Sequence, residues 1–311
     1  MTLSAIPIGR FTPGTEDWVQ ARSTRLGGSE IAAVLGLSPF ESRFSLWHRK
    51  MGTIGPTEQL PEMEWGNRLE PVVLAKFFEG PNRYQYGGQP GSYLHPERPW
   101  QMASPDALVS YGTQLDALVE AKTALYDDNW GPSGTDEIPV YYRCQVLWNL
   151  NVFSLRRAHI PVLIGGWDYR EYVIELDDRA QADTDILLRV GREFSDSLTS
   201  GQRPDIDAHD QTLQVVRQLH PDIELDDVEI DSALAAWYLA DNAREKEAKA
   251  GKQHAASRIL DRLGKARNAV TPDGERIAYR KPNGDHPPFL CPDPKAVKAR
   301  TTPPTIPGSA A

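Results

Sequence analysis

Apolar residues recur at helical spacing through residues 16–80, and this pattern predicts that the first part of the chain is mostly helical. A short apolar run after Ser29 predicts one helix, because serine is a preferred N-cap residue. Further on, Glu70 lies beside an apolar stripe of another predicted helix, and Pro71 is expected to distort the first turn of that helix. The stripes that carry the pattern are Phe44, Trp47 and Met51, and then Leu69, Val73 and Phe77.

The middle of the chain changes from helical spacing to alternation, which predicts strands. We expect a β-hairpin with one strand over 101–110, a turn at 111–113 and a return strand over 115–125. Pro139 favours a helix start, because proline fits the beginning of a helix. The remaining predicted elements are a helix over 138–155, strands over 159–165 and 167–176 around Gly165-Gly166, and a helix over 179–199.

The C-terminal third predicts a second, mostly helical unit over 228–268. A short hairpin is expected around Pro272-Asp273-Gly274, where turn residues cluster. Residues 283–311 contain seven prolines and few large apolar residues, which is typical of a disordered tail. The candidate core residues of the helical unit are Leu234, Trp237, Leu260 and Leu263.

The order of helices and strands predicts an α/β fold followed by a helical extension. We expect four regions, namely a core over 1–200, an acidic linker over 201–227, a helical appendage with a short hairpin over 228–282, and a disordered proline-rich tail over 283–311.

Composition excludes several classes of protein. The chain has 311 residues and a formal net charge of -9. It has no apolar run of about 18 residues and no apolar stretch near Met1, so we expect neither a membrane span nor a secretory signal. Its two cysteines, Cys144 and Cys291, exclude a disulfide scaffold and a four-cysteine metal site.

The charge is unevenly distributed. An acidic average argues weakly against a nucleic-acid partner. However, residues 203–231 have two basic and nine acidic residues, whereas residues 241–281 have eleven basic and six acidic residues. Basic residues on the C-terminal helix are typical of a solvated surface, and the alternative is an arm that follows the DNA backbone with salt-dependent affinity. The net charge therefore does not exclude a DNA substrate.

The strongest chemical signal is a pair of motifs, Ser104-Pro105-Asp106 and Glu120-Ala121-Lys122. Because side chains alternate along a strand, Glu120 and Lys122 are predicted to share one face. Asp106, on the other strand of the hairpin, is expected to meet Glu120 across the pair. Two carboxylates so close repel each other unless a cation lies between them, and oxygen ligands favour Mg²⁺ or Mn²⁺.

Each of these residues also has a plainer interpretation. A lone Glu-x-Lys pair on a strand is usually a solvated face, and an aspartate after a proline is often only a turn residue. Glu70 alone is typical of a helix surface. The combination favours a functional site, because charges embedded in apolar strands are costly unless they are used.

These motifs are similar to those of the PD-(D/E)xK nuclease superfamily. Over residues 16–176, and more loosely in the C-terminal helices, the chain resembles the YqaJ-like viral recombinase family, which includes lambda-type phage exonucleases. The resemblance implies a restriction-endonuclease-like core, with a central mixed sheet flanked by helices and a C-terminal helical extension. The matching blocks begin at Arg25, Gly36, Trp65, Ala103, Val119, Ile138 and Val162, and read RLGGSEIA, GLSPF, WGNRLEP, ASPD, VEAK, IPVYYRCQ and VLIGG.

The resemblance also implies roles for individual residues. Asp106, Glu120 and Glu70 correspond to the metal-binding carboxylates, with Mg²⁺ as the expected ion and Mn²⁺ as the alternative. Lys122 corresponds to the catalytic lysine, and Gln145 to the helix glutamine that supports the site. Tyr142 accompanies Gln145 in a P-x-x-Y-x-x-Q pattern, and core packing is an equally good interpretation of this tyrosine.

Arg25 and Ser29 form a second candidate site. A Gly-Gly-Ser turn that caps a helix exposes backbone N–H groups that can hold a phosphate, and Arg25 can pair with it. In lambda-type exonucleases a pocket of this kind binds the 5′-terminal phosphate, so the resemblance makes these two residues candidate substrate ligands. A plain N-cap beside a surface arginine is the alternative.

Trp130 lies where the family commonly has a tryptophan, within a segment, 125–137, that stands in place of the proline often found directly after the Glu-x-Lys strand. Core packing is the favoured interpretation of Trp130, and the alternative is a lid or base-stacking residue.

The activity implied by the resemblance is that of a Mg²⁺-dependent deoxyribonuclease, a 5′-to-3′ exonuclease on double-stranded DNA ends, in the cytoplasm of a bacterial host. Lambda-type enzymes are trimers and the products of resection need pairing, so a homo-oligomer and a single-strand annealing protein are the expected assembly and partner. Two alternatives stay open, namely a structure-specific endonuclease on the same fold and a non-catalytic DNA-binding recombination scaffold.

Overall fold

The computed structural model describes residues 5–12, 14–56, 60–80, 90–111, 114–300 and 305–307. The chain divides into two compact units, one of Met1–Pro221 with Pro304–Ala311 and one of Asp222–Pro303. The boundary after Pro221 falls inside the segment predicted as an acidic linker, 201–227.

The helices of the first unit follow the predicted pattern. Polar caps begin several of them, as where Ser42 and Ser45 form a capping box and where the Asp177 side chain accepts from the Ala180 backbone N–H. Helices α1 (Glu16–Ser23), α2 (Ile31–Val34), α3 (Arg43–Lys50) and α4 (Pro61–Phe78) confirm the helical prediction for 16–80. They are followed by α5 (Val140–Phe153), α6 (Asp178–Ser200) and α7 (Asp210–Leu219).

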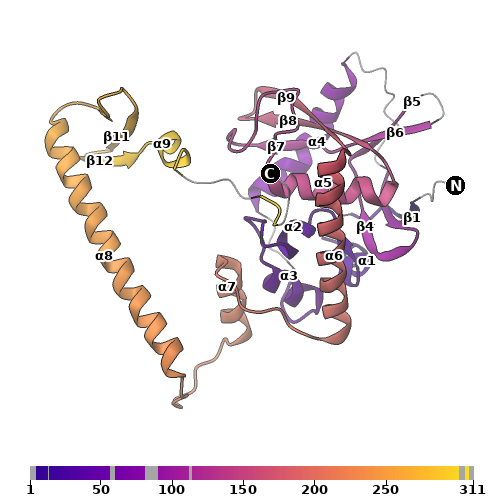
Figure 1. Ribbon diagram of the computed structural model, residues 1–311, viewed down its shortest axis with the longest axis horizontal. Coiled ribbons are helices and arrows are strands. Elements are labelled where there is room, and N and C mark those ends of the chain that lie inside the picture. Colours follow the sequence, from indigo (N-terminus) through magenta and orange to yellow (C-terminus); the bar gives the residue numbers. More distant parts are fainter. Residues whose placement is uncertain are drawn as a thin grey trace. The chain divides into compact units, whose positions relative to one another are not determined.

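A mixed sheet lies at the centre of this unit (Figure 1). Strands β6 and β7 follow one another along the same edge of β8 and run parallel to it. Strand β5 pairs antiparallel with β6, and β9 pairs antiparallel with β8. The strands are β5 (Ala107–Tyr111), β6 (Gln114–Val119), β7 (Lys122–Ala124), β8 (Arg157–Ile164) and β9 (Asp168–Glu175).

A second sheet has four strands, all of which precede the strands of the central sheet in the sequence. Its order is β1-β3-β4-β2, and only the β2–β4 pair is parallel. The strands are β1 (Ile6–Gly9), β2 (Leu26–Gly27), β3 (Ser92–His95) and β4 (Arg98–Ala103).

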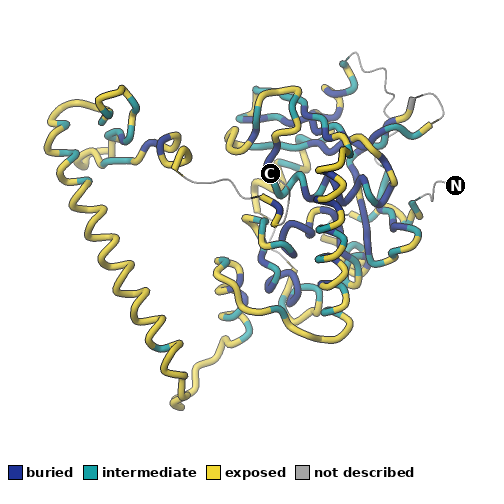
Figure 2. The backbone as a smooth tube through the Cα atoms, in the orientation of Figure 1, coloured by how far each residue is buried: buried dark blue, intermediate teal, exposed yellow. Residues whose placement is uncertain are grey.

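Apolar residues at alternate positions of the central strands contribute to two hydrophobic clusters. Val73, Leu74 and Phe77 of α4 pack with alternate residues of β5 and β6, including Val109 and Val119. The larger cluster joins residues of α2, α5, α6 and β8 (Figure 2). The predicted α/β fold, with a central mixed sheet flanked by helices, is therefore confirmed.

Trp148 fixes α5 within the larger cluster. Its Nε1 donates a hydrogen bond to the Met102 carbonyl at 3.0 Å, which joins α5 to β4. Its ring lies against Gly191 of α6, where an added Cβ would come within 2.8 Å of the ring. The hydrogen bond ties α5, the helix that carries Gln145, to β4, and the contact with Gly191 packs α5 against α6.

The second unit is dominated by one long helix, α8 (Ser232–Leu263), which confirms the prediction of a C-terminal helical extension. The predicted hairpin around Pro272-Asp273-Gly274 is also present, between β10 and β11. The elements that follow α8 are β10 (Asn268–Val270), β11 (Arg276–Asn283), β12 (His286–Pro292) and α9 (Pro294–Lys298).

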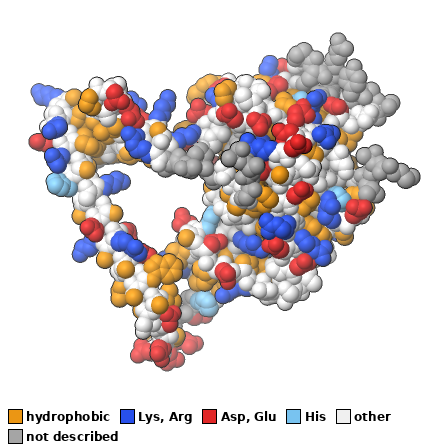
Figure 3. All heavy atoms as spheres, in the orientation of Figure 1, with side chains coloured by type: hydrophobic (Ala, Val, Ile, Leu, Met, Phe, Trp, Pro, Cys, Tyr) orange, Lys and Arg blue, Asp and Glu red, His pale blue; other side chains and the backbone are white. Residues whose placement is uncertain are grey.

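The prediction that Leu234 and Trp237 belong to a core of this unit is wrong, because their exposed fractions are 46% and 64%. No residue of α8, all of which is described, is buried. Basic and apolar side chains both line its visible surface (Figure 3). Strand β10 packs on α8 near its C-terminal end, and there Leu260 and Leu263 are partly covered.

The predicted strand over 101–110 is also wrong. Strand β4 ends at Ala103 in one sheet, and β5 begins at Ala107 in the other. Pro105, which has no backbone N–H for a ladder, lies in the connection. The return strand is likewise divided, between Val119 and Lys122, while the hairpin pairing itself is confirmed. Residues 112 and 113 of the predicted turn lie outside the described residues.

Two local predictions near the helix starts are corrected. Ser29 is not the N-cap of α2, because that helix begins at Ile31 and Glu30 precedes it. Pro71 lies in the interior of α4 rather than in its first turn, because the helix starts with Pro61.

The segments predicted as an acidic linker and as a disordered tail contain helices and a strand. Within 201–227, α7 packs against α3, where Thr212 Oγ1 donates to Ser42 Oγ at 2.7 Å and Val215 is buried. Within 283–311, β12 pairs with β11, and Asp293 caps α9. In both segments a few polar and apolar contacts outweigh the acidic or proline-rich composition.

In the described parts of the chain, no helix has the length and apolar character needed to cross a membrane. Cys144 and Cys291 are free thiols, in keeping with the exclusion of a disulfide scaffold.

Candidate active site

The candidate site lies where the central sheet is interrupted. Ala107 pairs with Val119 across the hairpin, so the next residues outward, Asp106 and Glu120, lie opposite each other. The Ala121 backbone N–H, at the break between β6 and β7, donates to Asp106 Oδ2 at 2.8 Å. The break thus frees a backbone donor that fixes one carboxylate beside the other.

Glu120 is fully buried and is held by three side-chain donors. Gln145 Nε2 donates to its Oε2 at 3.0 Å, and Asn149 Nδ2 donates to its Oε1. Gln145 and Asn149 lie four residues apart on α5 and therefore share one helix face. Lys122 Nζ forms an ion pair with Glu120 Oε2 at 3.2 Å, so these two residues lie on the same side as predicted.

The electrostatics of this pair favour an added cation. Burial and the nearby Glu120 carboxylate raise the pKa of Asp106 well above its ordinary value. Burial also raises the pKa of Glu120, although Lys122 opposes the effect. Negative charge on Glu70, from α4, adds to the rise for both carboxyl groups. Among the described residues, Lys122 is the cation that opposes these rises.

Lys122 itself stays protonated. Burial alone would lower the pKa of its amine, but Glu120 and Asp106 together raise it above the ordinary value. The ammonium also lies 5.1 Å from the centre of the Tyr142 ring, on the ring face. Tyr142 is thus brought to the site by contact with Lys122.

The donor set fits a hard divalent ion. Asp106, Glu120 and Glu70 offer carboxylate oxygens, which are the ligands that Mg²⁺ and Mn²⁺ prefer. Among the described residues, no group of three or more His, Cys, Asp or Glu side chains is already arranged as a metal site. The structure therefore brings two facing carboxylates together, with the third close enough to act on them electrostatically.

A small cavity of about 50 Å³ lies beside Gln145 and Asn149, the two amides that hold Glu120. Arg22 Nη2 donates to Ser29 Oγ in its wall at 3.1 Å. Gln145 and Asn149 line the cavity as well as holding Glu120. The complete lining is Arg22, Gly27, Gly28, Ser29, Ser104, Gln145 and Asn149.

The cavity needs a glycine at position 28, and two residues of its lining have buried polar atoms without a hydrogen-bond partner among the described residues. A Cβ at Gly28 would lie 2.3 Å from Asn149 Oδ1, so any other residue would displace that amide. Among the described residues, Arg22 Nε and Asn149 Oδ1 are buried and have no hydrogen-bond partner. The free N–H of Arg22 suits an anionic ligand.

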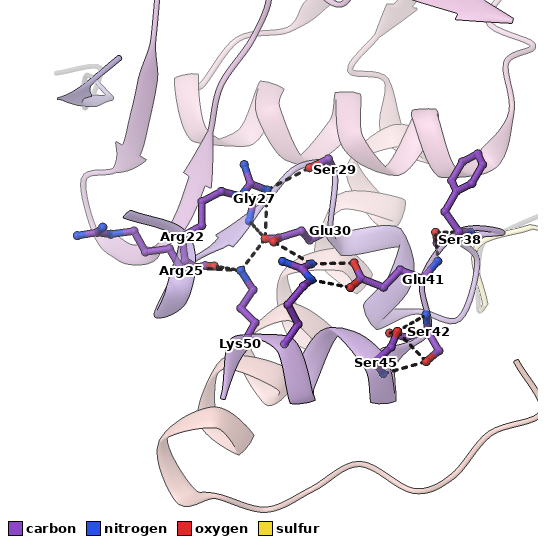
Figure 4. Close-up of polar contacts among 12 residues, drawn as sticks. Arg22, Arg25, Gly27, Ser29, Glu30, Ser38, Glu41, Ser42, Ser45 and Lys50 are labelled. Carbon is purple, nitrogen blue, oxygen red and sulfur yellow. Dashed lines mark hydrogen bonds and ion pairs between the residues drawn. The ribbon is translucent and has the colours of Figure 1, made fainter. Parts of the chain in front are cut away.

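Arg25, the residue predicted to accompany Ser29, points elsewhere. Its Nη1 donates to the Ala21 carbonyl at 2.7 Å, and its side chain extends away from Ser29 (Figure 4). The structure places Arg22 beside Ser29 instead. With four residues, α2 is also too short to provide the helix N-terminus on which the prediction relied.

Three residues of the site were missed by sequence reasoning. Asn149 follows Gln145 by one helical turn, so the spacing alone offered a signal. Ser104 belongs to the motif already selected for Asp106. Arg22 offered no comparable signal, because only the turn after α1 brings it to Ser29.

Trp130 packs in the core, as favoured. It is 8% exposed and belongs to the larger hydrophobic cluster. Its ring lies 5.1 Å from the Tyr172 ring and 5.7 Å from the Tyr142 ring. Trp130 thus supports Tyr142 from behind.

Residues 17–155 match the model of the YqaJ-like viral recombinase domain. The matched segment spans every candidate residue described above, from Arg22 to Asn149.

The chain is also similar to the uncharacterized protein YqaJ of Bacillus subtilis (strain 168). The two sequences are 28% identical over 214 residues, which is 67% of this chain. The match covers 64% of the relative's own length, somewhat less than two thirds.

Two solved structures are also similar to the chain. An alkaline exonuclease from Laribacter hongkongensis matches with a TM-score of 0.45 and 20% identity, covering 61% of this chain and 97% of the exonuclease. A phage-related exonuclease from Haemophilus somnus 129PT matches with a TM-score of 0.41 and 11% identity, covering 57% of this chain and 96% of the other.

Proposed function

We propose that this protein is a Mg²⁺-dependent deoxyribonuclease that degrades double-stranded DNA from its ends, in the 5′-to-3′ direction, as a step of phage-type recombination. The observation that carries the proposal is the shared wall between the carboxylate pair and the small cavity. Gln145 and Asn149 donate to Glu120 and also line the cavity that Arg22 and Ser29 enclose. A terminal phosphate held there would lie beside the carboxylates.

In this proposal Asp106, Glu120 and Glu70 hold Mg²⁺. Bound Mg²⁺ would supply an acidic water and offset the negative charge of the phosphodiester. Gln145 and Asn149 keep the Glu120 carboxylate oriented, and the Ala121 N–H does the same for Asp106. Both carboxylates are therefore held in fixed orientations beside each other.

Lys122 acts on the phosphodiester itself. Because its pKa is raised, it carries a proton at neutral pH and donates hydrogen bonds from a nearly buried position, where its side chain is 12% exposed. Such a donor orients the attacking water and stabilises the charge that develops on the phosphate. Contact with Tyr142 limits the movement of the ammonium.

Arg22, Ser29 and Ser104 bind the 5′-terminal phosphate. Arg22 keeps an unpartnered Nε N–H, and a guanidinium can pair with a phosphate through two parallel hydrogen bonds. The hydroxyls of Ser29 and Ser104 line the same cavity. This assignment replaces Arg25 with Arg22 and retains Ser29.

The test is degradation of linear duplex DNA in Mg²⁺ by the wild type and by Lys122→Ala. We expect rapid degradation by the wild type and a loss of at least about 100-fold in the variant, because removal of one charge-stabilising donor has such an effect. Glu79→Gln is a matched control, because Glu79 is an exposed residue at the C-terminal end of α4 and pairs with Lys76 on the surface. Equal degradation by wild type and Lys122→Ala would contradict the proposal.

The same assay separates the two alternatives. Cleavage of covalently closed circular duplex would identify a structure-specific endonuclease. Binding of DNA without hydrolysis in Mg²⁺ or Mn²⁺ would identify a recombination scaffold. An exonuclease leaves the circle intact and degrades the linear form.

The proposal extends to assembly and location by resemblance. A homo-trimer, a single-strand annealing protein as partner and a site of action in the bacterial cytoplasm remain predictions. Light scattering of the purified chain tests the trimer, and a monomer at micromolar concentration would contradict it.

A further inference from the structure

A second buried ionic cluster surrounds Glu30 and includes Arg22 (Figure 4). It is separate from the pair formed by Asp106 and Glu120. At its centre is Glu30, which is 4% exposed. Glu30 Oε2 accepts from the Gly27 backbone N–H at 2.8 Å and pairs with Lys50 Nζ at 2.8 Å and Arg22 Nη2 at 3.3 Å. Arg49 approaches the other oxygen, Oε1, at 3.5 Å.

Lys50 ties this cluster to the chain on both sides of the turn after α1. Besides Glu30, its ammonium donates to the Arg22 carbonyl at 2.8 Å and to the Arg25 carbonyl at 2.6 Å. These three acceptors use all three N–H groups of the amine. Since the Lys50 side chain is 1% exposed, the turn that carries Arg22 is fixed from inside the protein.

The geometry aims the guanidinium of Arg22. Its Nη2 lies between Glu30 Oε2 and Ser29 Oγ, while its Nε has no partner. A Cβ at Gly27 would lie 2.6 Å from Nη2, so the glycine permits this approach. Its Nη2 end is thus held by Glu30 and Ser29, while the Nε N–H, without a partner among the described residues, belongs to a side chain that lines the cavity.

The charges of the cluster leave a surplus that suits a phosphate. Burial alone would raise the pKa of Glu30, but Arg22, Lys50 and Arg49 hold it well below its ordinary value, so the carboxylate stays ionised. Glu41 pairs with Arg49 at 2.8 Å. Three cations thus face two carboxylates, and the excess positive charge lies next to the cavity.

We propose that Glu30 and Lys50 are positioning residues that hold Arg22 for a terminal phosphate, so that discrimination between 5′-phosphorylated and 5′-hydroxyl ends depends on them. The inference rests on the proposed function of the cavity and adds two residues that touch neither metal nor substrate. It predicts that phosphate recognition can be removed without altering Arg22, Ser29 or the carboxylate pair.

The experiment measures binding rather than hydrolysis, so it does not depend on nuclease activity. Fluorescence anisotropy in EDTA compares two duplexes that differ only in a 5′-phosphate or a 5′-hydroxyl. The protein samples are the full-length wild type, Glu30→Gln and the control Glu41→Gln. Glu41 is the matched control, because it pairs with Arg49 in the same cluster but makes no contact with Arg22.

We expect the wild type and Glu41→Gln to prefer the phosphorylated duplex by at least about tenfold, the value of one charge-assisted contact of about 1.4 kcal/mol. Glu30→Gln should bind both duplexes alike, with the affinity of the wild type for the hydroxyl end. A merely structural role would weaken binding of both duplexes equally and keep their ratio.

The double variant Glu30→Gln/Lys50→Met guards against loss of folding, because it removes a buried cation together with its carboxylate. A preference for phosphate retained by either variant, in a sample with a cooperative thermal transition, would overturn the inference. Absence of any preference in the wild type would overturn it too. Neither result bears on the degradation assay with Lys122→Ala, which judges the nuclease proposal separately.

Discussion

Glu30 and Glu120 are two buried glutamates in opposite electrostatic surroundings. Their exposed fractions are 4% and 0%. Glu30 is paired with Arg22, Arg49 and Lys50, whereas in the described part of the chain Glu120 is paired with one cation, Lys122, and faces a second carboxylate, Asp106. The pKa of Glu30 is held below its ordinary value, and the pKa of Glu120 is raised above it.

The difference separates a carboxylate that organises the protein from one that awaits a ligand. A buried charge costs several kcal/mol unless it is compensated. At Glu30 the chain provides the compensation itself, so the cluster can hold Arg22 in place. At Glu120 the compensation is incomplete, and an external divalent cation completes it in the proposed function.

The largest effect is expected for catalysis. Glu120→Gln should lower the rate of duplex degradation in Mg²⁺ by at least about 10³-fold, because several kcal/mol of metal-dependent stabilisation are lost. Initial rates on linear duplex DNA measure the change. Glu41→Gln, with the same chemical change in the other centre, should stay within about twofold of the wild type. If Glu120→Gln degraded DNA at the wild-type rate, Glu120 would not be needed for catalysis and the proposed difference between the two glutamates would be wrong.

For the stability of the metal-free protein, we expect the larger effect from Glu30→Gln and the smaller effect from Glu120→Gln. Glu30→Gln is expected to lower the free energy of unfolding by about 3 kcal/mol, because it leaves buried cations without their carboxylate. Glu120→Gln should change it by less than about 1 kcal/mol, because lost hydrogen bonds are offset by relief of repulsion with Asp106. Chemical denaturation in EDTA compares the two. A larger loss in Glu120→Gln would contradict the assignment.

Added Mg²⁺ should stabilise one centre only. At a concentration of about 100 times Kd, Mg²⁺ raises the free energy of unfolding by about 2.7 kcal/mol. Thermal melts should record this shift in the wild type and in Glu41→Gln, and no shift in Asp106→Asn. An equal shift in Asp106→Asn would place the cation elsewhere.

Both centres should depend on pH, but over different pH ranges. For Glu30, whose folded pKa is lowered, the stabilisation is complete above the ordinary value of 4.5 and is lost only as the pH falls below it. For Asp106 and Glu120, whose folded pKa values are raised, protons compete with the cation at higher pH. The Mg²⁺-induced shift in melting temperature should therefore shrink between about pH 8 and pH 5. A Mg²⁺ shift that is constant over this range would contradict the raised values.

The Glu120 centre was predictable from local sequence patterns. Alternation placed Glu120 and Lys122 on one face, and the hairpin placed Asp106 opposite Glu120. The apolar residues around these charges indicated that burial, rather than solvent, would set their chemistry. The helix that supplies Gln145 was also predicted, from the proline near its start.

The Glu30 centre was not predictable in the same way. Its residues come from α1, the turn before α2, and α3, and only the packed turn distinguishes Arg22 from Arg25. The connection around Pro105, which divides one predicted strand between two sheets, also depends on tertiary pairing. In the second unit, apolar residues such as Trp237 predicted a core, but the unit provides no element to cover that part of α8.

The most direct test of the comparison is binding of Mn²⁺ at pH 8, measured by electron paramagnetic resonance, to the wild type, Glu120→Gln and the double variant Glu30→Gln/Lys50→Met. The wild type and the double variant should bind with the same Kd, and Glu120→Gln should bind at least about tenfold more weakly. Unchanged affinity in Glu120→Gln, or a loss in the double variant as large as that expected for Glu120→Gln, would contradict the account.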